Sequence, residues 1–291
     1  MTTLSPAATA WQREQGRLLG IAYRMLGDYS EAEDVVSEVA ELAVHAEREA
    51  SEIRSWPAWL TTVCVRRSID RVRAIAARRE SYPGPWLPEP VATDRLPDDV
   101  VATREMLSIA LLHLAEQLPP RQRAAIVLHR AFAMSAPEIA EILETTPAAV
   151  RQLISRGERR LDIHPDQPVS TRVDAASLDR LIGGIESGDI TLVASMLEDD
   201  AVLWTDGGGV VSAALNPIFG AAAIARFVIG VFEKARRAND EILVGWLDVN
   251  GDPAIDFRRR VRRDVVTLQF GSTGRIAGIR QIANPDKHSR L

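Results

Sequence analysis

The 291-residue sequence has little of what several classes of protein depend on. It contains one cysteine, Cys64, which excludes an internal disulfide and suits a reducing compartment. No apolar run approaches the ~18 residues of a membrane-spanning helix. The first residues lack the basic start and apolar stretch of a signal peptide. We therefore expect a cytoplasmic protein that does not contact membranes.

Residues that hold metals or nucleotides are also sparse. The histidines are scattered, at positions 45, 113, 129, 164 and 288, and their spacing matches no metal-ligand pattern. The glycine cluster at 207–209 does not open a helical pattern, as a phosphate-binding loop would. Cys64 lies on an apolar helix face and is expected to be an inert core thiol. The sequence thus predicts neither a cofactor nor a metal.

What the sequence does contain is charge arranged in blocks, within a net charge of −5. Residues 28–52 hold nine acidic residues and one arginine. Residues 66–79 hold six arginines and one aspartate. Two adjacent helical segments of opposite sign indicate two partners of opposite charge.

Apolar periodicity divides the chain into several parts. Helical stripes cover residues 8–80, with a break at Gly27-Asp28, and residues 99–162. After residue 172, helices are expected at 174–186, 190–197 and 220–236, and strands at 201–205, 210–215, 241–249, 264–270 and 275–283. Asp206 and the glycines after it read as a hairpin turn between the first two strands. The expected fold is multi-domain, with two all-α domains and a C-terminal α+β domain that has a curved antiparallel sheet. The expected boundaries are 1–80, a linker at 81–98, 99–162, a second linker at 163–171, and 172–291.

The most informative stretch runs from Ser135 to Arg156. Ser135 and Glu138 form a capping box, and Thr146 with Pro147 begins a second helix after a short turn. Two short helices joined in this way are typical of a DNA-binding helix-turn-helix. The second helix would expose side chains that read base edges and hold phosphates: Arg151, Gln152, Ser155, Arg156 and Arg159. The alternative is a plain helical hairpin with a solvated basic face.

Several motifs, taken in order, resemble a known family. YRMLGDYSEAEDVVSEV (23–39), SWPAWLTTVCVRRSIDRVRAIAARRESY (55–82) and the helix-turn-helix region (114–161) are similar to those of bacterial extracytoplasmic-function (ECF) sigma factors. WLPEP (86–90), DGGG (206–209) and NPDK (284–287) resemble the subgroup with a C-terminal SnoaL-like domain. This resemblance implies a sigma factor that binds core RNA polymerase and directs it to promoters.

The resemblance assigns partners to the charged helices. The acidic helix is expected to bind the clamp of the largest polymerase subunit through Glu31, Glu33, Asp34, Glu38 and Glu41. The arginine-rich helix is expected to hold and melt the −10 element through Trp56, Arg66, Arg67, Arg71 and Arg73. The helix-turn-helix would read the −35 element. The alternatives are a solvated acidic face for the first helix and core packing for Trp56 and, more strongly, for Trp59.

The linker carries four prolines in the nine residues 82–90, yet it has Trp86 and Leu87 at its middle. An apolar pair clamped by prolines is typical of a preordered docking peptide. The resemblance names the C-terminal domain as its dock, although Trp86 packing on a neighbouring helix remains an alternative. The expected interdomain contacts involve Trp86, Leu87, Pro88, Glu89, Pro90, Asp206, Gly207, Gly208, Gly209, Asn284, Pro285, Asp286 and Lys287.

SnoaL-like folds are cones around an apolar pocket, so the resemblance leaves room for a small apolar ligand. An isomerase or cyclase of this fold needs a general base, for which Asp206, Asp256 and Asp264 are the candidates, with Trp204 as a pocket wall. We expect a regulatory domain and not an enzyme. The rival interpretations are a ligand-sensing regulator that binds DNA without polymerase, and a SnoaL-type isomerase or cyclase with a DNA-binding appendage. The arginines between 258 and 263 fit DNA, polymerase or a solvated strand edge equally well.

Overall fold

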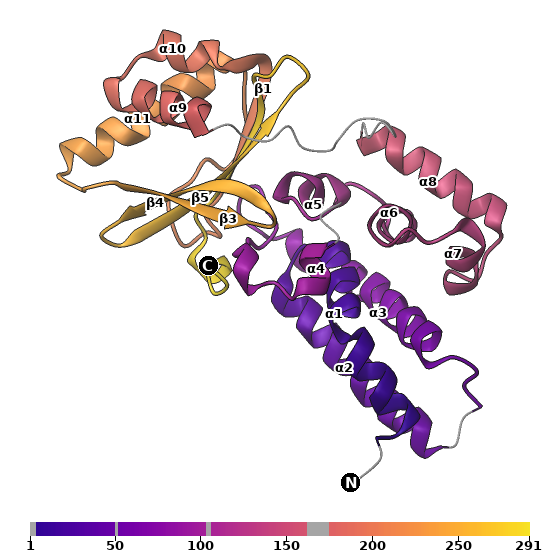
Figure 1. Cartoon of the computed structure of the whole chain (residues 1–291). Helices are drawn as coiled ribbons and strands as arrows, with labels where there is room; N and C mark the ends of the chain where they lie inside the picture. Colours follow the sequence, from indigo (N-terminus) through magenta and orange to yellow (C-terminus); the bar gives the residue numbers. More distant parts are fainter. Residues whose placement is uncertain (1–3, 50–51, 103–105, 162–174) are drawn as a thin grey trace. The chain divides into compact units, whose positions relative to one another are not determined.

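The structure is a computed structural model that describes residues 4–49, 52–102, 106–161 and 175–291 (Figure 1). The chain forms two compact units. The helical unit holds the described residues of Met1–Glu80, Leu96–Leu107 and Leu111–Gln167, and the α+β unit holds Ser81–Arg95, Ser108–Ala110 and those of Pro168–Leu291. Within the described ranges, no helix has both the length and the apolar content needed to cross a bilayer.

Three long helices begin the helical unit: α1 (Pro6–Leu26), α2 (Tyr29–Arg48) and α3 (Trp56–Arg79). Their N-caps are Ser5, Asp28 and Ser55, whose side chains accept hydrogen bonds from the first turn. The predicted break after α1 is confirmed, because Gly27 ends the helix with a φ of 67° that glycine adopts readily. The apolar stripes meet in a core built from Leu18, Ile21, Met25, Val35, Val39, Leu60 and Val65.

Five shorter helices follow: α4 (Asp98–Ala102), α5 (Ile109–Ala115), α6 (Pro120–Phe132), α7 (Ala136–Ile142) and α8 (Pro147–Leu161). The predicted capping box is confirmed, since Ser135 N donates to Glu138 Oε2 at 2.8 Å. Thr146 Oγ1 accepts from Ala149 N at 3.2 Å and starts α8 as expected. Helices α7 and α8 therefore form the helix-turn-helix that the sequence predicts.

The two helical groups of this unit contact each other. Arg123 of α6 donates to the Met25 carbonyl at 2.7 Å. The Phe132 ring lies 5.6 Å from the Arg17 guanidinium and 5.4 Å from that of Arg24, which is 1% exposed. Burial lowers the pKa of Arg24 to about 10. The contact thus buries positive charge against an aromatic face and backbone carbonyls.

The described residues of the α+β unit form three helices and six strands: α9 (Ala175–Ser187), α10 (Ile190–Ser195), β1 (Leu197–Asp206), β2 (Ile218–Phe219), α11 (Ala221–Arg237), β3 (Leu243–Val249), β4 (Asp252–Arg259), β5 (Arg262–Phe270) and β6 (Ile276–Ile282). Two 3-10 turns, η1 (Thr93–Arg95) and η2 (Pro285–Lys287), complete it. The strand order is β2-β1-β6-β5-β4-β3. Figure 1 shows α9, α10 and α11 gathered on one face of the sheet, where the apolar core lies.

Several sequence-based expectations for this unit are wrong in detail. Residues 210–215 form no strand, so the expected hairpin at Asp206 is absent. Instead, the amides of Val210 and Val211 both donate to the Gly207 carbonyl and close a tight turn. The sheet is not wholly antiparallel, because β1 pairs in parallel with β6. Strand β4 was not expected at all, and the linker predicted at 163–171 lies outside the described residues.

Candidate functional sites

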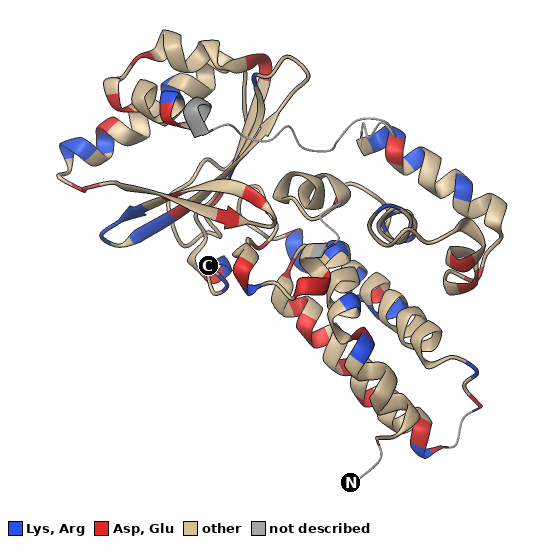
Figure 2. Cartoon of the chain, viewed as in Figure 1, with Lys and Arg blue, Asp and Glu red and all other residues tan. Residues whose placement is uncertain are grey.

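Helix α8 presents one basic face to solvent. Its other face is buried through Val150, Ile154 and Gly157, the last of which packs closely on Ile126 of α6. All five predicted base-reading side chains are exposed: Arg151, Gln152, Ser155, Arg156 and Arg159. Figure 2 shows the basic residues along this helix. Such a face offers the donors that recognise base edges and phosphates in a major groove.

The arginines of α3 divide into two kinds. Arg66, Arg67 and Arg73 are exposed. Arg71 is 23% exposed and contacts the carboxylates of Glu31 and Glu38. Its charge is therefore already neutralised within the unit, which makes it a poor phosphate ligand compared with its exposed neighbours.

The acidic residues of α2 divide in the same way. Burial alone would raise the pKa of Glu31, but hydrogen bonds from Arg71 and Arg78 outweigh burial and lower it. Asp34 and Glu41 are exposed, and Glu33 is half-buried. The acidic surface that a basic partner could reach is thus narrower than the sequence suggests.

Trp56 and Trp59 lie together at the start of α3. Their rings are 5.6 Å apart in an edge-to-face arrangement, and both are half-buried. Each ring keeps part of its surface exposed, so both predicted roles, core packing and base stacking, remain compatible with the structure.

A cluster in the α+β unit, which we call the clasp, joins the linker to the end of β1 and to the last residues of the chain. Its centre is Asp206, which is 0% exposed. The carboxylate accepts hydrogen bonds from Tyr82 Oη at 2.5 Å, Leu87 N at 2.9 Å and Gly208 N at 3.1 Å. Lys287 Nζ lies 2.7 Å away and forms a buried ion pair.

The other clasp contacts come from WLPEP, DGGG and NPDK. Lys287 also donates to the Leu87 carbonyl, and its ammonium lies 3.8 Å from the centre of the Trp86 ring. Asn284 donates to Tyr82 Oη at 3.0 Å and packs where a Cβ at Gly208 would stand. The structure therefore brings together the three motifs that the sequence singled out.

Two clasp residues were missed in the sequence. Tyr82 precedes the WLPEP motif and is bonded directly to Asp206. Asn250 is 2% exposed and binds Val91 of the linker twice. Its side-chain Oδ1 accepts from Val91 N at 3.0 Å, and its backbone N–H donates to the Val91 carbonyl. The Asn250-Gly251 dipeptide is typical of a hairpin turn and could have been recognised in the sequence. Its side-chain contact with Val91 could not, because that partner is distant in sequence.

The remaining carboxylates considered as general bases are paired with arginines. Asp256 is 1% exposed and accepts from Arg263 at 2.8 Å and from Arg258 at 2.8 Å. Burial alone would raise the pKa of Asp256, yet these two arginines lower it. Asp264 accepts from Arg262 at 2.9 Å. The guanidinium of Arg280 lies 4.8 Å from the ring of Trp204, the residue predicted as a pocket wall.

A helix-turn-helix whose second helix exposes arginines, in one unit with an arginine-rich and an acidic helix, is typical of a DNA-binding protein. Residues 10–79 match the family model for Sigma-70 region 2, and residues 108–161 match that for Sigma-70, region 4. The chain is 34% identical to the "ECF RNA polymerase sigma factor SigJ" of Mycobacterium tuberculosis, covering 93% of this chain and 89% of that protein. The chain belongs to the ECF RNA polymerase sigma factors, so it binds core RNA polymerase and directs transcription initiation at promoters.

Two further comparisons show how far the likeness extends. The "Probable ECF RNA polymerase sigma factor SigI" of M. tuberculosis is 28% identical over 56% of each chain. The crystal structure of M. tuberculosis SigJ matches with a TM-score of 0.73 and 29% identity, covering 97% of this chain and 98% of that chain. The C-terminal α+β region is thus part of the shared fold.

Proposed function

We propose that the clasp controls how this sigma factor uses its DNA-binding helices. In this proposal, residues 1–80 bind the polymerase clamp and the −10 element, and residues 99–162 bind the −35 element. Residues 172–291 form a regulatory domain that holds the linker at 81–98. The protein works in the cytoplasm, where its polymerase is.

The observation that carries the proposal is the burial of Asp206 among linker and C-terminal groups. Tyr82 and Leu87 belong to the linker, and Lys287 belongs to the last turn of the chain. A linker held in this way is not a free tether. Its release would restore the reach of an extended chain, about 3 Å per residue.

The same contacts favour a regulatory domain over an enzyme. A general base needs a carboxylate that can take up a proton from a substrate. Asp206, Asp256 and Asp264 are each engaged by a cationic side chain. The sigma-factor relatives also disfavour a regulator that acts without polymerase.

The proposal is tested by Lys287→Met, which leaves the buried carboxylate of Asp206 without its cation. Losing one partner of a buried pair costs about 3 kcal/mol or more, so the linker should detach. We expect protease cleavage within residues 81–95 to rise at least fivefold. Transcription in vitro with purified core polymerase should change at least twofold. Removing residues 284–291 should act in the same direction without unfolding the helical unit.

Arg180→Met is the matched control, because it replaces an exposed cation of α9, outside the clasp, with the same side chain. It should leave both cleavage and transcription unchanged. If Lys287→Met makes the linker more sensitive to protease but the uncut variant transcribes as the parent does, the clasp has no regulatory role.

A further inference from the structure

Two adjoining cavities lie between α11 and the sheet. The inner one has a volume of about 70 Å³ and is walled by aliphatic side chains such as Leu181, Ile185, Ile224, Ile255 and Val266. The outer one has a volume of about 410 Å³. Phe227, Val231, Arg259 and Gln281 line both cavities, so they stand where the two meet.

The outer cavity combines an apolar wall with a charged rim. Its wall includes Ala213, Ala214 and Ala235, and its rim carries three cations, Lys234, Arg259 and Arg262, against one acid, Asp240. A cavity of this size holds a small organic ligand, and convergent polar groups orient such a ligand. The excess of cations at the rim favours an anionic group.

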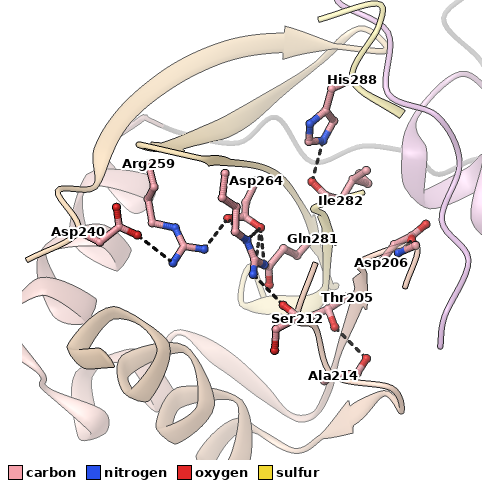
Figure 3. Close-up of polar contacts among 12 residues, drawn as sticks. Thr205, Asp206, Ser212, Ala214, Asp240, Arg259, Asp264, Gln281, Ile282 and His288 are labelled. Carbon is pink, nitrogen blue, oxygen red and sulfur yellow. Dashed lines mark hydrogen bonds and ion pairs between the residues drawn. The ribbon is translucent and has the colours of Figure 1, made fainter. Parts of the chain in front are cut away.

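Asp264 neutralises Arg262, which leaves Lys234 and Arg259 against Asp240, and its oxygens are already occupied (Figure 3). It accepts from Arg262 Nε at 2.9 Å, from Gln281 Nε2 at 3.1 Å and from Arg259 Nη2 at 3.3 Å. Arg262 is also fully engaged, since its Nη1 donates to the Ser212 carbonyl at 2.7 Å. A cationic ligand therefore meets no acceptor at Asp264.

Arg259, by contrast, is held loosely. Its side chain is 13% exposed and has one long hydrogen bond, to Asp264, and one ion pair with Asp240 at 3.8 Å. A guanidinium carries five N–H donors, and it binds a carboxylate best through two parallel hydrogen bonds. A ligand carboxylate where the two cavities meet would take the place of Asp240 and make that bidentate contact.

We propose that the C-terminal domain binds an amphipathic organic anion. Arg259 holds the acidic group, with Lys234 beside it, and the apolar body of the ligand fills the outer cavity and reaches the inner one. The nearby strands connect this site to the clasp. Thr205 lines the outer cavity and pairs with Gln281 across β1 and β6, while the next pair, Asp206 and Ile282, lies at the clasp.

Successive side chains of a strand point to opposite faces, so Thr205 faces the cavity and Asp206 faces the clasp. A ligand beside Thr205 thus contacts the strand end that holds the clasp. The use of the ligand as a regulator rests on the function proposed above. The binding itself does not, and its test contains neither polymerase nor DNA.

Two fluorescent probes that differ in charge provide the test. Anilinonaphthalene sulfonate is an amphipathic anion, and N-phenylnaphthylamine is its neutral counterpart. We expect the folded full chain to bind one molecule of the sulfonate, which octanoate displaces and octanol does not. Arg259→Gln should weaken sulfonate binding about tenfold, as expected for a charge-assisted bidentate contact, and change binding of the neutral probe less than twofold.

Two variants sharpen the result. Arg260→Gln removes the same charge from an exposed neighbour and should leave both affinities unchanged. Asp240→Asn should tighten sulfonate binding, because it releases Arg259, and it decides the matter if Arg259→Gln does not fold. Four outcomes would each overturn the proposal. In Arg259→Gln the two probes are weakened equally, or Arg260→Gln has the same effect as Arg259→Gln. Alternatively, octanol displaces the sulfonate as strongly as octanoate does, or Asp240→Asn does not tighten sulfonate binding.

Discussion

Gly157 illustrates how closely α8 packs in the helix-turn-helix. A Cβ at this position would stand 2.7 Å from Ile126 Cγ1 and 2.9 Å from its Cδ1, and Ile126 is 0% exposed. Alanine normally favours a helix over glycine by about 1 kcal/mol. Overpacking a buried site costs about 1–3 kcal/mol, so here the clash outweighs the propensity.

We therefore predict that Gly157→Ala destabilises the protein by about 1–2 kcal/mol, whereas Gly183→Ala stabilises it by about 0.5–1 kcal/mol. Gly183 is an exposed residue of α9 whose added Cβ would meet no atom within 4 Å. Thermal unfolding of the two variants measures the difference. Equal shifts of the two melting temperatures would mean that Ile126 adjusts without cost.

A second residue-scale prediction concerns Arg71. The lowered pKa of Glu31 means that its ion pair stabilises the fold fully above the ordinary value of 4.5, and that this stabilisation is lost as the pH falls through the lowered value. Arg71→Ala should therefore cost about 1 kcal/mol at neutral pH, as partly exposed pairs do. The cost should shrink below pH 4.5, as urea unfolding from pH 7 to 3 would show.

Arg73→Ala is the control for this variant, because Arg73 is exposed and pairs only with its neighbour Asp70 among the contacts described. It should lower stability little at any pH. A constant difference between Arg71→Ala and the parent across the whole pH range would contradict the assigned pairing.

The sequence predicted the three motifs that meet at the clasp, but not Tyr82 and not how the residues pair. Asp206 looked like a turn residue because aspartate before glycine is common in turns. In the structure it ends β1 and is buried, since Tyr82, Leu87 and Lys287 come from 81 to 124 residues away and surround it. Likewise, the sequence does not distinguish Arg71 from Arg73 as DNA ligands. The packing of α2 on α3 does, because it pairs Arg71 with Glu31 and leaves Arg73 exposed. Periodicity gives the face of a helix, whereas partners distant in sequence depend on the tertiary fold.

At the scale of elements, α8 gives the clearest prediction. Arg151→Ala or Arg156→Ala should cost about 1–3 kcal/mol of binding at promoters with an intact −35 element. Transcription in vitro from such a promoter should fall about tenfold or more, and far less where that element is scrambled. Both side chains are exposed, so stability should not change.

Arg13→Ala on α1 is the matched control, being an exposed arginine far from α8 in sequence. It should leave both promoters unaffected. Equal losses at intact and scrambled promoters would mean that Arg151 and Arg156 bind phosphates without reading bases. The slope of log binding constant against log salt concentration would then fall by about one for each arginine removed.

Helices were easier to predict than strands. Capping residues and apolar spacing located α7 and α8 because these signals are local. Residues 210–215 are rich in apolar and β-branched side chains, yet β1 pairs with β2 and β6 and leaves them no place in the sheet. Strand β4 was missed because its sequence, DPAIDFRR, begins with two residues that disfavour strands. A strand depends on its neighbours, and its neighbours are distant in sequence.

At the scale of the whole molecule, the two predicted DNA-binding surfaces of the helical unit touch. Arg66 of α3 lies 2.7 Å from Glu144, which occupies the turn of the helix-turn-helix with a φ of 48°. Promoter elements about 25 bp apart are separated by roughly 85 Å, at about 3.4 Å per bp. With the two surfaces assigned to these elements as proposed, we expect the contact to open before both elements are bound.

We therefore predict that closing this contact covalently blocks initiation. In the variant Arg66→Cys with Glu144→Cys, a short bismaleimide reagent should join the two thiols. The native Cys64 does not interfere, because it is 0% exposed and burial raises the pKa of its thiol to about 12. The cross-linked protein should still bind core polymerase through α2, yet initiate transcription at least tenfold more slowly. The two single-cysteine variants, treated with the same reagent, measure the cost of losing Arg66 or Glu144 alone, and the cross-linked protein should initiate at least tenfold more slowly than either of them. A cross-linked chain that initiates as fast as the untreated one would show that promoter recognition proceeds with the two surfaces in contact, and the separation argued from promoter geometry would then be wrong.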